Sequence, residues 1–361
     1  MKPPPRVLPF APGCYHAFYL PHGHPPLLAA LLNQQQRKYR FWLLGLALAL
    51  LGAMLLSLQL GAVGVGIEAL WRPVSALEQQ VFWQLRLPRT LLAILVGASL
   101  ALCGAVLQVL LHNPLAEPGL IGISSGASLA AVGTLALSAH LGLVLPYWIL
   151  SLAAFVGALV VTGLLLSLAR RRLGQGALLL FGVAVSIFAN AIMTWLLYLA
   201  DDASLRTFLF WMMGSLGYGQ QLSFWWWLPA VLTLGWLMAQ GRRLDLLGLG
   251  ENQARLLGLD VRRLRPRLVL AVCLLTAFCV AMAGVIGFIG LVVPHLLRLL
   301  VGGRQRFLLP GSVLAGATLL ALADVAARQT LAVGELPIGA VTATLGAPVF
   351  IWLLVRRYAG T

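Results

Sequence analysis

Long apolar runs separated by short polar turns dominate the chain. Because a helix needs about 20 apolar residues to cross a bilayer, the pattern predicts an all-α polytopic membrane protein with about ten transmembrane helices. Glycine or proline interrupts both ends of the third and the eighth run. The runs lie at 41–60, 90–111, 119–139, 147–169, 177–199, 222–240, 266–285, 287–301, 308–327 and 338–355.

Composition supports the membrane class. Of the 361 residues 60% are hydrophobic and 10% are charged, whereas roughly a quarter of the residues of a soluble domain are charged. A formal charge of +15 would suggest a nucleic-acid partner in a soluble protein. Here basic loops that orient membrane helices explain the charge, so we expect no nucleic-acid binding.

The basic residues predict the orientation of these helices. Most lysines and arginines fall on one side of the predicted spans, and the basic residues of the other side are Arg72, Arg86, Arg89, Arg206 and Arg328. Because basic loops are usually cytoplasmic, we place both termini in the cytoplasm and these arginines outside.

The chain divides into two regions of different composition. Residues 1–36 contain eight prolines within the first 26 positions, which predicts a disordered extension. Its three scattered histidines indicate a metal site only weakly. Residues 37–357 form one transmembrane domain, with a single long cytoplasmic loop at about 242–265.

The stretch 86–128 is expected to lie at the centre of the domain. Its apolar run contains small residues where leucine would suit a helix surrounded by lipid. Small residues allow close helix approach in a membrane, so this span is predicted to pack against other helices. The small residues are Gly97, Ala98, Ser99, Ala101, Gly104 and Ala105.

Two arginines precede this central span. Arg86 and Arg89 flank Leu87-Pro88, and the proline restricts the local backbone. Two explanations of external positive charge stay open. The guanidinium groups contact lipid phosphates, or they bind the carboxylates of an external protein.

The loop at 242–265 contains a short amphipathic pattern. If 250–258 is helical, Gly250, Ala254, Leu257 and Gly258 share a face, while Glu251 and Arg255 are adjacent at i, i+4. Such a helix could lie on lipid headgroups or dock in a groove of a soluble partner. Spacing alone does not separate the two.

Acidic residues are rare in the predicted spans, which argues against two other classes of protein. An ion-coupled secondary transporter usually needs intramembrane carboxylates, and Asp324 is better explained by an i, i+4 ion pair with Arg328. Glu335 lies just before the last span. A membrane-embedded transferase would need clustered acidic metal ligands, and the candidates are dispersed: Glu117, Asp245, Glu251 and Asp260.

Several motifs in order resemble one transporter family. They are Arg86-Leu-Pro-Arg89, Asn113-Pro-Leu-Ala-Glu-Pro-Gly119, 284–298, Leu309-Pro-Gly311 and 335–354. Over roughly 33–357 the chain is similar to the permease subunits of ATP-binding-cassette (ABC) importers for cobalamin, haem and iron–siderophores, the FecCD type. Within this family its motifs are most similar to those of the cobalamin permeases.

The resemblance implies a type II ABC importer permease fold in the bacterial inner membrane. Two permeases form a homodimer, two cytoplasmic ATPases bind ATP and magnesium, and a periplasmic binding protein delivers the substrate. The chain itself is then not an enzyme, which agrees with its lack of a P-loop, and it binds no cofactor. The expected cargo is cobalamin, with haem or an iron–siderophore as the alternative.

The resemblance also implies roles for individual residues. Arg86, Arg89 and Arg328 match outer arginines that meet glutamates of the binding protein, and Asn113 and Leu115 match the cytoplasmic gate. The segment 250–258 matches the helices that couple the permease to the ATPase. Gly174-Gln175 stands where cobalamin permeases have a Ser-Thr pair, which leaves the second half of the gate open.

Overall fold

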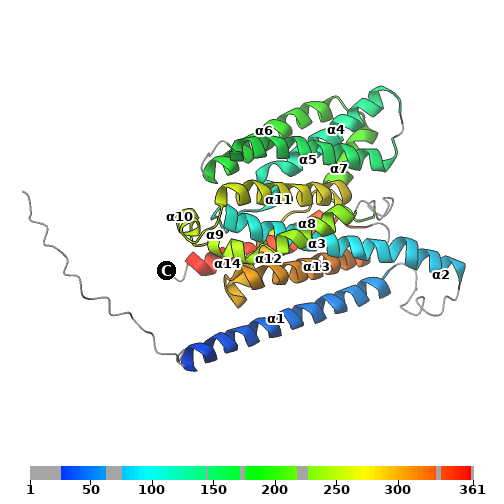
Figure 1. The fold of residues 1–361 in the computed structure, drawn as a ribbon. Helices are drawn as coiled ribbons and strands as arrows, with labels where there is room; N and C mark the ends of the chain where they lie inside the picture. Colours follow the sequence, from blue (N-terminus) through cyan, green and yellow to red (C-terminus); the bar gives the residue numbers. More distant parts are fainter. Residues whose placement is uncertain are drawn as a thin grey trace, which may run out of the picture.

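The fold is built from helices. The computed structural model describes residues 26–61, 75–143, 145–170, 175–217, 227–330 and 335–358, and all regular elements in these ranges are helical (Figure 1). The all-α prediction is therefore confirmed. Gly174 and most of the proline-rich start lie outside the described residues.

The helices follow one another with short connections. In chain order they are α1 (Pro26–Gln59), α2 (Ala76–Gln80), the π-helix η2 (Val81–Arg86), α3 (Leu87–Leu110), the 3-10 helix η3 (Pro118–Ile121), α4 (Ile123–His140), α5 (Tyr147–Arg170), α6 (Gln175–Tyr198), α7 (Asp202–Met212), α8 (Trp227–Met238), α9 (Gly241–Leu247), α10 (Glu251–Leu256), α11 (Val261–Ala283), α12 (Ile289–Val301), α13 (Gln305–Gln329) and α14 (Ile338–Tyr358).

Six segments of the described chain are long and apolar enough to cross a membrane. They contain α1, α2 with η2 and α3, α5, α6, α11 and α13. Of the other predicted spans, α8, α12 and α14 have shorter apolar stretches, and α4 is 18 residues long. The number of ten spans therefore stays a prediction.

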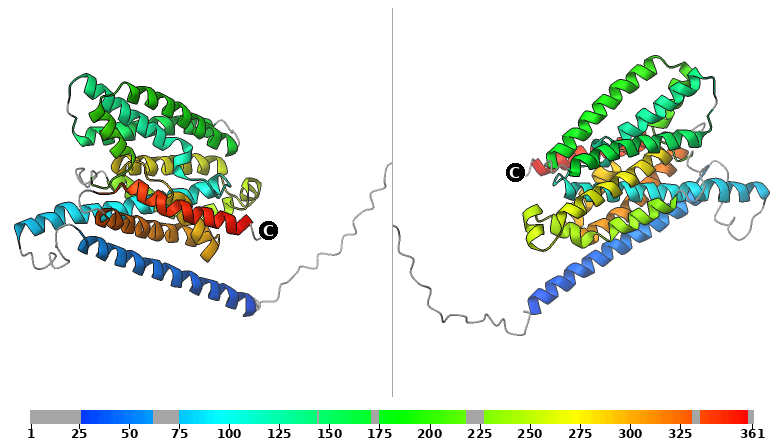
Figure 2. Two further views of the ribbon diagram at one scale, coloured as in Figure 1. Left: turned by 180° about the vertical axis from the view of Figure 1, so that it is seen from behind. Right: turned by 45° about the horizontal axis from the view of Figure 1, so that its top comes forward.

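The long helices lie roughly side by side in successive layers (Figures 1 and 2). Helix α1 packs on α13 at one edge, α13 packs on α3, and α11 joins α3 to α5, beyond which lie α4 and α6. The described chain begins and ends at the same end of this bundle, where α10 also lies. Helix α2 marks the opposite end.

Helix α3 occupies the centre of the bundle, as its small residues predicted. Gly97 lies against the backbone carbonyl of Gly316 on α13, and Gly104 lies against that of Gly290 on α12. A Cβ atom at either position would overlap those carbonyl groups. The close approach of α3 to its neighbours therefore requires glycine at these positions.

The segment between α3 and α4 folds back along α3. Gly290 lies between Pro118 of this segment and the carbonyl of Leu100, which is near the middle of α3. Irregular backbone at membrane depth is tolerated where protein covers it, and Pro118 is buried. The run 119–139 therefore starts in the 3-10 helix η3, and α4 begins only at Ile123.

One other boundary differs from the prediction. Helix α1 already begins at Pro26, so residues 26–36, assigned to the disordered extension, are helical. Proline is tolerated in the first turn of a helix, and the following Leu-Leu-Ala-Ala-Leu-Leu favours helix. Trp211 is buried at the end of α7.

Candidate functional site

The charged groups at the α2 end of the bundle meet around Arg89. Its Nη2 lies 2.8 Å from Asp324 Oδ1 on α13. Its Nη1 and Nη2 donate to the two carboxylate oxygens of Glu335 at 2.7 and 2.9 Å. Arg89 is 7% exposed and the Asp324 side chain is fully buried. One guanidinium therefore joins α3, α13 and the segment before α14.

Arg328 completes this cluster from α13. Its Nε lies 3.0 Å from Asp324 Oδ2, which confirms the predicted i, i+4 pair. Its Nη2 also donates to Ser57 Oγ at 2.9 Å, and Ser57 shares a 2.8 Å hydrogen bond with Thr90. The cluster therefore also ties the end of α1 to the bundle.

Arg86 is held by the backbone of α1. Its Nη1 donates to the carbonyls of Leu58 and Gln59 at 2.9 and 3.2 Å, and it is 5% exposed. Arg86 is the last residue of the π-helix η2. Short π-helical segments often occur at functional sites. A Cβ atom at Gly61 would overlap the guanidinium, so Gly61 lies directly against Arg86.

The structure thus gives these three arginines internal partners. The resemblance implies that all three meet an external protein, which stays a prediction. In the structure they lie in or beside one cluster in which Asp324 and Glu335 supply the negative charge. The sequence indicated Asp324 as the partner of Arg328, but it gave no signal that Arg89 shares it. We call Arg86, Arg89, Asp324, Arg328 and Glu335 the outer charge cluster.

Glu335 is the accessible member of this cluster. Its side chain is 47% exposed, and the hydrogen bond from Arg89 lowers the pKa of Glu335 below its usual value. The backbone after it is fixed at both sides, because Leu336 N donates to Ala327 O and Ile338 N to Gly214 O. An approaching protein would therefore meet a carboxylate first, with the guanidinium groups behind it.

The predicted gate after α3 is an ordered turn. Asn113 Oδ1 accepts a hydrogen bond from Leu115 N at 2.9 Å, and Asn113 N donates to Gln108 O. Leu115 is exposed. Asn113 therefore shapes the turn, and Leu115 presents an apolar side chain from it. The other predicted gate pair cannot be placed, because Gly174 and the side chain of Gln175 lie outside the described residues.

The predicted coupling segment forms α10 at the opposite end of the bundle. Gly250 and Gly258, with φ of +107° and +84°, bracket this helix, and glycine adopts such angles without strain. Glu251 and Arg255 form the expected i, i+4 pair at 2.7 Å. Ala254 is fully buried.

One residue of this segment lies differently from the prediction. Ala254 and Leu257 were placed on one face, but α10 ends at Leu256, and Leu257 is exposed. Leu256 is 87% exposed. The segment thus presents two adjacent leucines to its surroundings, which is unusual for a helix that faces water.

The coupling segment is joined to the transmembrane bundle. Asp245 of α9 accepts a hydrogen bond from Gln305 N at 2.5 Å and lies 3.7 Å from Arg306 Nε. Asp260 caps α11 by accepting from Arg263 N at 3.1 Å. The helix before α10 is therefore held by the start of α13, and the helix after it begins at a capped end.

Comparison with known proteins identifies similar chains of nearly the same length. Residues 47–356 match the model of the FecCD transport family. The vitamin B12 import system permease protein BtuC of Salmonella typhi is 49% identical over 90% of this chain and 98% of its own. The Shigella boydii protein of that name is 47% identical over 91% and 99%.

A solved structure has the same fold. It is an inward-facing conformation of an ABC transporter of the metal-chelate type, with a TM-score of 0.75 and 34% sequence identity. The alignment covers 87% of this chain and 98% of that one.

Proposed function

Because the chain belongs to the FecCD transport family, we propose that it is the permease subunit of an ABC importer that moves cobalamin across the bacterial inner membrane. The observation that carries this proposal is the 47–49% identity to vitamin B12 permeases over about nine tenths of the chain. ATP and magnesium are bound by separate ATPase subunits, and a periplasmic binding protein delivers the cargo.

The cytoplasmic partner binds at α10. Short helices with apolar side chains dock in grooves of soluble proteins, and the exposed Leu256 and Leu257 suit such a groove. Family resemblance favours this partner over the lipid surface. Closure of two ATPases on nucleotide would displace α10, and the contacts of Asp245 would pass that movement to α13. The transport step is then a rigid-body change between two states.

The binding protein docks at the opposite end, over the outer charge cluster. The resemblance assigns Arg86, Arg89 and Arg328 to glutamates of that protein. Their internal bonds refine this role. Carboxylates of the binding protein would join or replace Glu335 on Arg89, because Glu335 is the half-exposed partner and Asp324 the buried one.

Two copies of the permease enclose the pathway. Helices α6 and α14 have many exposed apolar side chains, including Phe188, Trp195 and Trp352. This suits helices that face a second subunit, an apolar pathway or lipid. The termini are then cytoplasmic, in agreement with the basic loops.

Uptake measurements test the cargo. A permease-null strain that retains a cobalamin-binding protein and the ATPase should recover uptake of labelled cobalamin when it expresses this chain. Uptake of haem or of a ferric siderophore instead, with their own binding proteins and ATPases present, would show that the alternative cargo is the correct one. The similarity to a metal-chelate type transporter favours that candidate over any unrelated cargo.

A further inference from the structure

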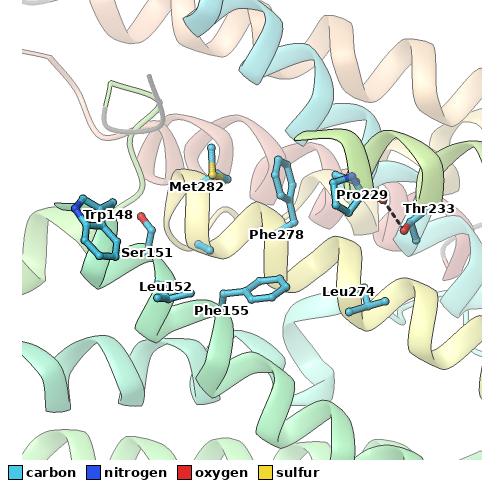
Figure 3. A pocket seen from close by; sticks show the side chains of 11 residues that line it. Trp148, Ser151, Leu152, Phe155, Pro229, Thr233, Leu274, Phe278 and Met282 are labelled. Carbon is cyan, nitrogen blue, oxygen red and sulfur yellow. Dashed lines mark hydrogen bonds between the residues drawn. The ribbon is translucent and has the colours of Figure 1, made fainter. Parts of the chain in front are cut away.

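A cavity of about 350 Å³ lies between α5, α8 and α11 (Figure 3). Its walls are mainly apolar, with Phe155 from α5, Pro229 from α8 and Phe278 from α11. An apolar cavity of about 150 Å³ already holds benzene and stays free of water. This cavity has more than twice that volume.

The cavity contains one polar group without a partner. Ser151 is 4% exposed, and its Oγ has no hydrogen-bond partner among the described residues. Buried serine and threonine hydroxyls in helices usually bond to a carbonyl of the preceding turn. Thr162 on the same helix does so, and so does Thr233 in the cavity wall, at 2.8 and 2.7 Å. Ser151 does not, and its hydroxyl lines the cavity.

The cavity lies toward one end of the bundle. Ser151 is one turn from the start of α5, beside Trp148, whose side chain is 47% exposed. Two of the three wall residues of α8, Pro229 and Ala230, lie in its first turn, and those of α11 lie in its second half. In this topology these are the outer halves of the three helices. Tryptophan at such a position is typical of the headgroup region.

We propose that this cavity binds an acyl chain of a phospholipid from the outer leaflet, with an ester carbonyl that accepts the hydrogen bond of Ser151. Water is not stable against apolar walls, and an unfilled cavity would forfeit dispersion contacts. The acyl chain of the lipid lies along Phe155 and Phe278 toward Leu274. The ester group remains at the level of Trp148, where the glycerol backbone of a bilayer lies. The inference takes from the proposed function only the orientation, and it is independent of the cargo.

Photo-crosslinking tests the occupant. The full chain is reconstituted in bilayer nanodiscs that contain a phospholipid with a diazirine on its acyl chain, irradiated and mapped by peptide mass spectrometry. We expect stronger labelling of the peptides around Phe155 and Leu274 than of the exposed apolar face of α1. Equal labelling, or labelling confined to α1, would overturn the proposal.

Variants define the site. Ala230→Leu and Ala281→Leu fill the cavity and should reduce its labelling to the level of α1, whereas Ala47→Leu on α1 should not. Ser151→Ala removes the hydrogen bond and should weaken labelling by about threefold. Ser167→Ala is its control, because the hydroxyl of Ser167 bonds to Leu164 O. Unchanged labelling in the filled variants would contradict the site.

A measurement on the wild-type protein keeps the test independent of variant folding. Native mass spectrometry of the detergent-purified protein should show one retained phospholipid per chain. Loss of all lipid under conditions that keep the fold, or a second permease chain covering α5 and α8, would overturn the proposal. Neither the photo-crosslinking nor the native mass spectrometry depends on cobalamin uptake.

Discussion

Arg89 and Asp324 are 235 positions apart in the chain, yet Arg89 Nη2 lies 2.8 Å from Asp324 Oδ1. This ion pair joins the first turns of the central helix α3 to the last turns of α13. Both side chains are largely withdrawn from solvent, and Glu335 binds the exposed edge of the same guanidinium. The pair is thus at once a structural connection and the inner part of the proposed docking surface.

Removing Arg89 should strongly destabilise the protein. Arg89→Ala leaves the Asp324 carboxylate with Arg328 as its remaining ionic partner, and breaking a buried ion pair from one side costs about 3–5 kcal/mol. The matched control is Arg255→Ala, which removes an exposed helical pair worth about 0.3–0.5 kcal/mol. Thermal unfolding of the purified proteins in detergent measures both. Equal losses of stability would contradict the structural role of Arg89.

The bond between Arg89 and Glu335 gives a dependence on pH. Arg89 lowers the pKa of Glu335, so the contribution of this bond to folding stability is present above the unfolded pKa of about 4.3. It is lost as the pH falls through the lower, folded value. The difference in unfolding temperature between wild type and Glu335→Gln should therefore be constant near neutrality and shrink in acid. A difference that persists in acid would exclude this cause.

Glu335 should also compete with the binding protein. Because Glu335 occupies the accessible side of Arg89, Glu335→Gln should increase affinity for the binding protein by about 0.2–1 kcal/mol, the range of an exposed ion pair. Surface-immobilised binding protein and the reconstituted permease allow this measurement. Glu251→Gln at the other end is the control. Weaker binding of Glu335→Gln would show instead that this carboxylate assists docking.

Some features of this fold could be predicted because their cause is local. The small residues of 97–105 predicted a buried α3, since lipid contact would favour leucine there. The pair Asp324–Arg328 followed from helical spacing, and so did Glu251–Arg255.

Other features depend on how the helices pack and therefore left no local signal. Hydropathy alone does not show where a regular helix begins, so the 3-10 segment before α4 had the same pattern as the start of a span. No sequence signal indicated that Arg89 binds carboxylates from both α13 and the segment before α14, or that Arg86 binds backbone carbonyls of α1. Leu257 does not share a helix face with Ala254 as predicted, because α10 ends at Leu256.

The coupling role of α10 predicts the effect of a single exposed leucine. Leu256→Asp should leave the fold intact, because this side chain is 87% exposed, but should weaken ATPase binding by more than about 2 kcal/mol if it is an interface hot spot. Co-purification of the ATPase and its stimulated activity are the readouts. Leu141→Asp, an exposed leucine of the opposite end, should change neither.

Retention of the ATPase by the Leu256→Asp variant would favour the other reading of the segment, in which α10 rests on lipid headgroups. That reading has a distinct consequence. Binding of the detergent-solubilised permease to anionic liposomes would then fall in the variant, since one apolar contact with the bilayer is lost.

The glycine contacts of α3 predict a sharp difference between two similar substitutions. A Cβ atom at Gly104 would overlap the carbonyl of Gly290, whereas one at Gly133 on α4 meets no atom within 4 Å. Gly104→Ala should therefore force α3 and α12 apart and cost about 1–3 kcal/mol. Gly133→Ala should be neutral or stabilise by up to about 1 kcal/mol, because alanine favours helix. Thermal unfolding of the two variants in the same detergent compares them directly, and equal stability would mean that α3 and α12 are not in contact at this point.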